Sequence, residues 1–430
     1  MQYICLASIY MLDFQQSMLT RNPVTKEPGH IAFFKLGGTW DMVKVNGKLV
    51  GSGILDDETL NKLEKAIGFY KKGKQDFIKL ELSLAKKIDE ITEINSGRDT
   101  DITDHLKWVP RIAKRVHGKF IPLFSGDSAH LRPSLIAPFV SHLLKFANDN
   151  PSVQITGAQG TDSADISILT LLDAFTFDTS FLPILFTGSN RSHGEWNSDA
   201  PRNFIDLTQV VGANLPSGAY WIFASHVYRA SDFVKIDPLE SRRIENYTTF
   251  FSPRLTARHT KKIIEENHIF RPPLATSAPK SHISQKIKAA DLYQALTKIS
   301  IVDLGDQKNT EEDVSEILND KTRAVIVAAH SLGNVNNPIK HACVQAALKG
   351  KLIIVVSRSL IGEVNERYAA SLLGVNEKEL LGSGKMVISG HKMNKNVAKA
   401  VVARAVLEKL DQKHTQTLIN VYCESRTLIS

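Results

Sequence analysis

Short apolar segments alternate along the chain with longer segments in which apolar residues recur every three or four positions. Strands that are apolar throughout are typical of sheets buried on both faces, and helices between successive strands favour parallel pairing. The pattern therefore predicts an α/β protein with mainly parallel sheets flanked by helices. The segments expected to form strands are Ile31–Leu36, Phe120–Phe124, Val153–Thr156, Pro183–Thr187, Ala219–Phe223, Ile299–Leu304, Ala324–Ala328, Leu352–Val356 and Met386–Ser389.

The alternation is interrupted twice, and both interruptions bear on domain organisation. Between 237 and 288 several prolines predict an extended linker, and 430 residues exceed what one hydrophobic core usually supports. We expect an N-terminal domain over 1–245, a linker over 246–288 and a smaller C-terminal domain over 289–430. The charged stretch 57–115 predicts a helical insertion in the first domain.

Composition narrows the class of protein. The chain is 43% hydrophobic and 23% charged, and no apolar run approaches the roughly 20 residues of a membrane helix. The distant cysteines Cys5, Cys343 and Cys423 argue for a reducing compartment, so we expect a cytoplasmic protein. The net charge of +8 is spread along the chain, so we do not expect a nucleic-acid partner. The histidines lack metal-binding spacing, and no metal is expected.

Polar residues follow many of the predicted strands immediately. Ligands of parallel sheets collect beyond the carboxyl ends of strands, so these positions predict an active site. Glycine–threonine pairs at Thr39 and Thr161 combine close backbone approach with a potential nucleophile, although each pair alone also fits a capped turn. The polar clusters are 37–39, 127–128, 160–162, 188–191 and 333–334.

These clusters, taken in order, resemble the bacterial-type L-asparaginases, a family that includes archaeal amidotransferase D subunits. The resemblance covers almost the whole chain except about 57 to 115. It implies a larger N-terminal α/β domain and a smaller, flavodoxin-like C-terminal domain. The segments that carry it are 35–39 (KLGGT), 127–131 (DSAHL), 159–162 (QGTD), 186–191 (FTGSNR), 198–203 (SDAPRN), 230–235 (ASDFVK), 332–336 (LGNVN) and 357–364 (SRSLIGEV).

The resemblance implies a hydrolase of amino-acid metabolism that cleaves the side-chain amide of L-asparagine without a cofactor. Thr39 matches the threonine nucleophile that forms an acyl-enzyme. Thr161 and Lys235 match the residues that activate the nucleophile or the water. The resemblance also implies a homodimer or homotetramer, because family sites are built at a subunit interface. The preference between asparagine and glutamine stays open at this point.

The remaining matched positions are implied to bind substrate. Asp162 matches the carboxylate that holds the α-amino group, and Ser128 matches the position that holds the α-carboxylate. The backbone of Ser189 matches an oxyanion contributor, and Asn334 is expected to contribute to the neighbouring subunit's site. Each has a plainer interpretation: Ser128 and Asp162 also fit helix caps, and Asn334 fits a turn.

The sequence departs from the family pattern at three places. The loop 40–50 lacks the tyrosine that usually closes over the substrate, Gln159 replaces a common histidine, and Ala129 replaces a common polar residue. Two alternative functions follow. One is a tRNA-dependent amidotransferase subunit, although only about 36 residues precede the first Gly-Thr. The other is a catalytically degenerate homologue that binds an amino acid as a sensor.

Overall fold

The structure, a computed structural model, describes two larger sheets and the helices that pack on them. The predicted insertion at 57–115 lies outside the described residues. The described residues are 30–36, 42–45, 48–51, 117–124, 133–161, 168–191, 199–213, 215–235, 250–251, 258–259, 287–305, 310–359, 362–367, 369–375, 380 and 382–427.

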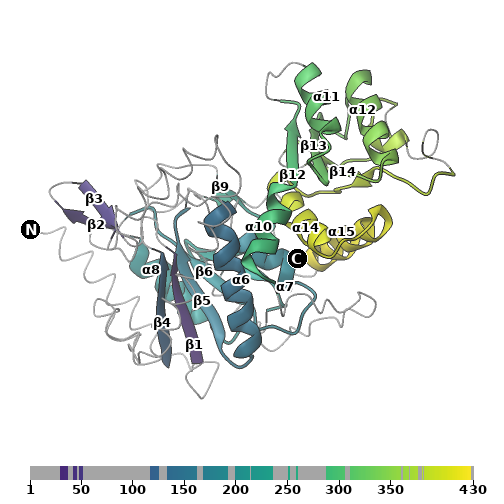
Figure 1. The fold of residues 1–430 in the computed structure, drawn as a ribbon. Helices are drawn as coiled ribbons and strands as arrows, with labels where there is room; N and C mark the ends of the chain where they lie inside the picture. The colour runs from purple at the N-terminus through teal and green to yellow at the C-terminus, as the bar shows by residue number, and fades with distance from the viewer. Residues whose placement is uncertain are drawn as a thin grey trace, which may run out of the picture.

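A seven-stranded sheet forms the larger body, in the order β11-β8-β7-β6-β5-β1-β4 (Figure 1). Five strands, β7, β6, β5, β1 and β4, run parallel to one another. At the edge next to β7, the strands β8 and β11 each pair antiparallel with their neighbour. The strands are β1 (His30–Leu36), β4 (His117–Phe124), β5 (Gln154–Gln159), β6 (Ile184–Thr187), β7 (Ala219–Phe223), β8 (His226–Arg229) and β11 (Arg258–His259).

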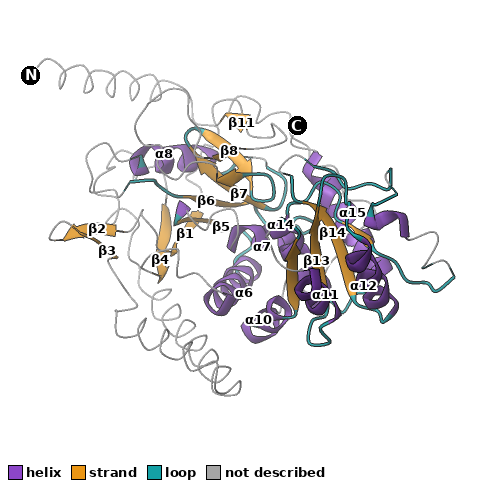
Figure 2. Cartoon of the chain, turned by 90° about the horizontal axis from the view of Figure 1, so that it is seen from above, coloured by secondary structure: helices purple, strands orange, loops and turns teal. Residues whose placement is uncertain are grey.

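Both faces of this sheet are buried, as its apolar strands require. In β1, Ile31 and Phe33 pack in the core beneath α8 (Ala200–Val210), whereas Ala32 and Phe34 pack in the core beneath α6 (Pro133–Asp149) and α7 (Ile168–Thr176). The strict alternation follows from the two-residue period of a strand. Figure 2 shows α8 apart from α6 and α7, with the strands between them.

The second sheet is smaller, and its strands are parallel in chain order: β12 (Ile299–Asp303), β13 (Ala324–Ala329), β14 (Leu352–Ser357) and β15 (Ile388–Ser389). One face packs on α10 (Ala289–Thr297) and α14 (Lys395–Leu407), and the other packs on α11 (Thr310–Leu318) and α12 (Asn337–Leu348). The fold class predicted from the sequence, two mainly parallel sheets flanked by helices, is confirmed.

One hydrophobic core runs between the sheets. Helices α6 and α7 of the first sheet pack on α10 and α14 of the second, and their buried residues form a single cluster. Buried charges cross the same boundary: Arg404 of α14 forms two hydrogen bonds to Asp178, at 2.9 and 2.8 Å. Tyr422 of α15 (Gln412–Thr427) donates to Asp173 of α7, which also pairs with Arg229.

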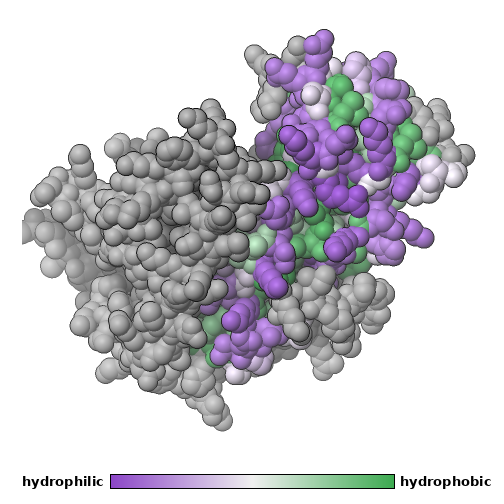
Figure 3. Space-filling view, viewed as in Figure 1, coloured by the Kyte–Doolittle hydropathy of each residue, from purple (hydrophilic) through white to green (hydrophobic). Residues whose placement is uncertain are grey.

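All the segments predicted as strands form strands. The pattern missed the hairpin of β2 (Met42–Val45) and β3 (Lys48–Gly51), the edge strands β8 and β11, and the short pair of β9 (Val234–Lys235) and β10 (Phe250–Phe251). Both β10 and β11 lie within the predicted linker. Hydrophilic side chains cover most of the described surface in Figure 3. Among the described helices, none has the length and hydrophobicity needed to cross a membrane.

Candidate active site

The carboxyl ends of three neighbouring strands are aligned by their register. Leu36, the last residue of β1, pairs with Gln159 at the end of β5 and with Phe124 at the end of β4. Thr161 therefore lies just beyond the edge of the sheet at which β1 and β4 also end. In the sequence, Thr39 follows β1 and Ser128 follows β4. The alignment makes this edge the candidate active site, as parallel sheets generally do.

Gln159 and Thr161 are buried at this edge. Thr161 is 3% exposed and Gln159 is fully buried. Neither the Nε2 nor the Oε1 atom of Gln159 has a hydrogen-bond partner among the described residues. An unpaired buried amide costs about 1–3 kcal/mol, so the protein maintains a polar group here at the expense of stability.

The loop that follows β6 lies beside Gln159. A Cβ added at Gly188 would approach the Gln159 carbonyl oxygen to 2.6 Å and the Trp221 ring to 2.7 Å, so only glycine fits. Ser189 is 1% exposed, and its Oγ has no hydrogen-bond partner within the described part of the chain. The tight contact at Gly188 thus holds Ser189 close to the end of β5.

Asp199 fixes the conformation of this loop. Its carboxylate accepts hydrogen bonds from the backbone N–H groups of Asn190, at 3.0 and 3.1 Å, and Arg191, at 3.0 Å. Burial raises the pKa of Asp199, whereas these backbone hydrogen bonds lower it. Asn203 supports the arrangement by donating to Asp199 and to the Gly188 carbonyl. Asp199 and Asn203 thus brace the loop after β6.

The segment that carries Lys235 is held against the same loop by aromatic packing. Phe233 stacks on Trp221 with ring centroids 6.0 Å apart, and Trp221 is the residue that limits the space at Gly188. Lys235 follows in β9, two residues later. Its backbone is therefore linked through two rings to the loop that carries Ser189.

Asn334 lies on the other sheet. It closes a tight turn after β13, where the backbone N–H groups of Gly333 and Asn334 donate to the carbonyl of His330. Gly333 has φ +106°, which only glycine adopts readily. The Asn334 Oδ1 atom is buried and lacks a hydrogen-bond partner among the described residues. The structure thus does not group Asn334 with Thr161 and Ser189.

Thr39, Ser128 and Asp162 lie outside the described residues, as does the side chain of Lys235. Within the described ranges, no cluster of three His, Cys, Asp or Glu residues could hold a metal ion. Two contributors to the site were not assigned a role from the sequence. Gln159 appeared only as a departure from a pattern, and Trp221 appeared only as part of a strand.

The sheet order and this edge define a class: an α/β protein with two parallel-dominated sheets and a polar site at the carboxyl edge of the larger one. Residues 84–264 match the family of asparaginase N-terminal domains. This part of the chain, which contains Thr161, Ser189 and Lys235, is therefore similar to the asparaginase N-terminal domains. The resemblance predicted from the ordered motifs is confirmed. Thr39 precedes the matched stretch.

Solved structures show the same fold over the length of the chain. The thermostable L-asparaginase from Thermococcus kodakarensis aligns with a TM-score of 0.58 and 15% identity, covering 91% of this chain and 96% of that one. A probable cytoplasmic L-asparaginase from Campylobacter jejuni gives 0.55 and 16%, covering 91% and 99%. L-asparaginase I from Vibrio cholerae gives 0.52 and 15%, covering 91% and 96%. None of the curated protein sequences matches the chain.

Proposed function

We propose that the chain is an amidohydrolase that cleaves the side-chain amide of L-asparagine to L-aspartate and ammonia. The observation that carries the proposal is the buried polar group formed by Gln159, Thr161 and Ser189 at the carboxyl ends of β5 and β6. The unpaired atoms of Gln159 and Ser189 suit a small polar ligand, which would supply the missing hydrogen bonds. The family match over 84–264 supports an amide as that ligand.

In the proposed reaction the Thr39 hydroxyl attacks the carbon of the side-chain amide. The hydroxyl proton passes to Thr161 and Lys235, and the C–N bond breaks as the nitrogen takes up a proton and leaves as ammonia. Water then hydrolyses the ester on Thr39 and releases aspartate. The backbone N–H of Ser189 stabilises the oxyanion, a contribution of about 3–4 kcal/mol per donor in enzymes of this kind.

The proposed substrate contacts are distributed around the same edge. Asp162 binds the α-ammonium group and Ser128 binds the α-carboxylate. Asn334 completes the site of a neighbouring subunit in a homodimer or homotetramer. Glutamine is longer by one methylene, a difference worth about 1–3 kcal/mol in a fitted pocket, so the relative rates on the two amides measure how well the pocket fits asparagine.

The test is ammonia release by the purified full chain with L-asparagine, L-glutamine and their D-forms. Release that is fastest from L-asparagine, with one aspartate formed per ammonia, is expected. A Thr161→Val variant should lose this release, whereas Thr176→Val should keep it, because Thr176 is also buried but lies at the end of α7. Binding of aspartate without turnover of any amide would reject the hydrolase and favour an amino-acid sensor.

A further inference from the structure

A row of cations marks the amino edge of the second sheet. Lys298, Arg323 and Lys351 each directly precede β12, β13 and β14, and the strand register places the three at one level. Ile354 pairs with Ile388 in β15. Lys385 precedes Ile388 by the same number of residues as Lys351 precedes Ile354, so Lys385 lies at the level of the row. Neighbouring strands are about 4.8 Å apart, so the row presents one positive charge at nearly every strand spacing.

A cavity of about 330 Å³ opens at this row. Lys321 and Lys349, in the turns after α11 and α12, add two further cations to its lining, and Leu318 and Ala346 supply an apolar wall. Among the residues that line it, Asp320 is the sole carboxylate. The cavity is within the range of small-ligand sites, and its lining carries a clear excess of positive charge.

Part of this charge has a structural role. The Lys351 ammonium donates to the carbonyls of Ile317 and Asn319, and Arg323 donates to the carbonyl of Gly350. These contacts satisfy carbonyls near the ends of α11 and α12, where cations are favoured. Two of the five cations in the lining are thereby accounted for.

The other three cations are not accounted for in this way. The backbones of Lys298, Lys321 and Lys349 form hydrogen bonds, but their side chains form no hydrogen bond or ion pair with the described residues. Burial lowers the pKa of Lys351, the nearby Asp320 and Glu316 raise it, and the charge of Lys349 lowers it further. Lys349 and Lys351 thus repel each other across the cavity wall, and a bound anion would relieve this repulsion.

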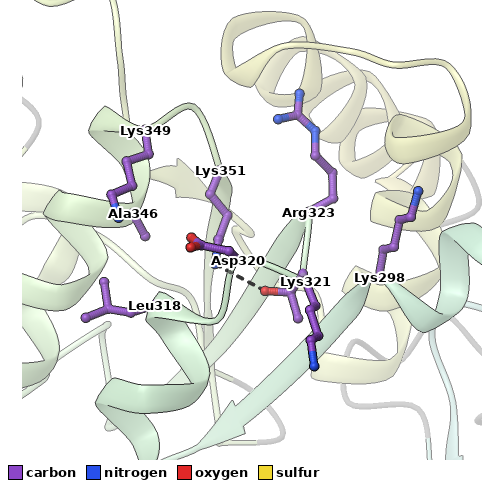
Figure 4. A pocket seen from close by; sticks show the side chains of 9 residues that line it. Lys298, Leu318, Asp320, Lys321, Arg323, Ala346, Lys349 and Lys351 are labelled. Atoms are coloured by element: carbon purple, nitrogen blue, oxygen red, sulfur yellow. Dashed lines mark hydrogen bonds between the residues drawn. The ribbon is translucent and has the colours of Figure 1, made fainter.

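The arrangement of the side chains indicates the kind of anion. Figure 4 shows Lys349 on one side of the cavity and Arg323 with Lys298 on the other, with their charged groups spread around the opening. Cations on two sides of the cavity favour an extended anion with several charges, such as a chain of phosphates, over a single compact anion. The site lies at the end of the sheet opposite the turn of Asn334, and therefore away from the carboxyl edge.

We infer that this cavity binds a small polyphosphate, either inorganic or carried by an organic group. Phosphate oxygens bind Lys349 on one side and Lys298, Lys321 and Arg323 on the other. Lys351 forms the positively charged floor. The inference is independent of the amide chemistry at the first sheet.

Isothermal titration calorimetry of the full chain tests it, with sodium tripolyphosphate, ATP and a single-stranded oligonucleotide as separate ligands. One tripolyphosphate or ATP per chain is expected. The double variant Lys321→Gln/Lys349→Gln should bind about tenfold more weakly, because two exposed charge contacts are lost. Weaker binding of tripolyphosphate than of ATP would assign a contribution to the apolar wall and so supports the site.

The matched control is Lys145→Gln/Lys409→Gln, which removes the same charge from exposed positions outside the cavity lining. It should bind within about twofold of the unaltered chain, since only long-range charge is changed. Equal weakening in both variants would overturn the inference, as would the absence of saturable binding. Binding of the oligonucleotide alone would also overturn it, because the row would then serve a macromolecule.

Discussion

The carboxylate of Asp199 accepts the backbone N–H of Asn190 through both oxygens, at 3.1 and 3.0 Å. Asp199 stands at the start of α8, yet its side chain does not cap its own helix and instead holds the loop after β6. This loop carries Ser189, whose N–H is the proposed oxyanion donor. The position of the proposed oxyanion donor thus depends on the buried carboxylate of Asp199.

Replacing Asp199 with asparagine keeps the shape and removes the charge. One side-chain oxygen becomes an NH₂ group that faces backbone N–H donors, so the loop should shift. We expect kcat/KM for L-asparagine to fall roughly 10- to 100-fold, as displacements of catalytic groups by about 1 Å do. Asp149→Asn, at an exposed position near the end of α6, is the control and should leave steady-state kinetics unchanged. Unaltered kinetics in Asp199→Asn would contradict the role of the loop.

Variants of two buried glutamines of β5 distinguish a role in the site from a role in stability. Gln159 has no hydrogen-bond partner within the described residues, whereas Gln154 donates to the Pro183 carbonyl and accepts from the Gly212 N–H. Gln159→Met should therefore preserve or raise the free energy of unfolding and reduce amide hydrolysis. Gln154→Met should lower the free energy of unfolding by about 1–3 kcal/mol and preserve hydrolysis.

Denaturant unfolding and ammonia release on the same two variants check this expectation. A loss of stability in Gln159→Met equal to that in Gln154→Met would mean that the Gln159 amide is already satisfied within the protein. Full activity in Gln159→Met would remove it from the site.

The ion pair between Arg404 and Asp178 should contribute strongly to the association of the two sheets. Both side chains are almost fully buried, and removal of Asp178 leaves Arg404 with Glu408 as its remaining carboxylate partner, at 2.8 Å. Asp178→Ala is expected to lower the free energy of unfolding by about 2–3 kcal/mol, because two hydrogen bonds to a buried charged group are lost. Glu363→Gln, which breaks the exposed pair with Lys392, should cost less than about 1 kcal/mol. Similar losses in the two variants would contradict the structural role of the buried pair.

His142 should make stability fall in mild acid. Burial and, to a smaller extent, the charge of Lys145 together lower its pKa from 6.5 to about 4. The unfolded chain takes up a proton at His142 below about pH 6.5, but the folded chain does so only near pH 4. Stability is therefore present above pH 6.5 and is lost as the pH falls toward 4, by at most about 3 kcal/mol.

Unfolding free energies at pH 7 and pH 5 measure this effect. His142→Gln should reduce the difference between the two pH values, whereas His341→Gln, at an exposed position of α12, should retain it. An unchanged difference in His142→Gln would assign the acid sensitivity to other groups.

The central strands were predictable because each is a short apolar run between helical segments, and the site edge followed because Thr161 and Ser189 come directly after such runs. The edge strand β8 could not be predicted, since His226 and Arg229 give it no apolar pattern. The hydrogen bonds of Asp199 to a loop eight or nine residues away were not predictable either, because they depend on how β6 and α8 meet in space. The row formed by Lys298, Arg323 and Lys351 likewise appears only once the strand register is known.

The most direct test of the threonine amidohydrolase is ammonia release from L-asparagine by the unaltered chain and by Thr39→Ala, both confirmed to be folded by circular dichroism. We predict steady release by the unaltered chain and a loss of at least about a thousandfold in the variant, because no acyl-enzyme can form. Full release by Thr39→Ala would contradict the assignment of the nucleophile. Absence of release by both would contradict the amidohydrolase itself.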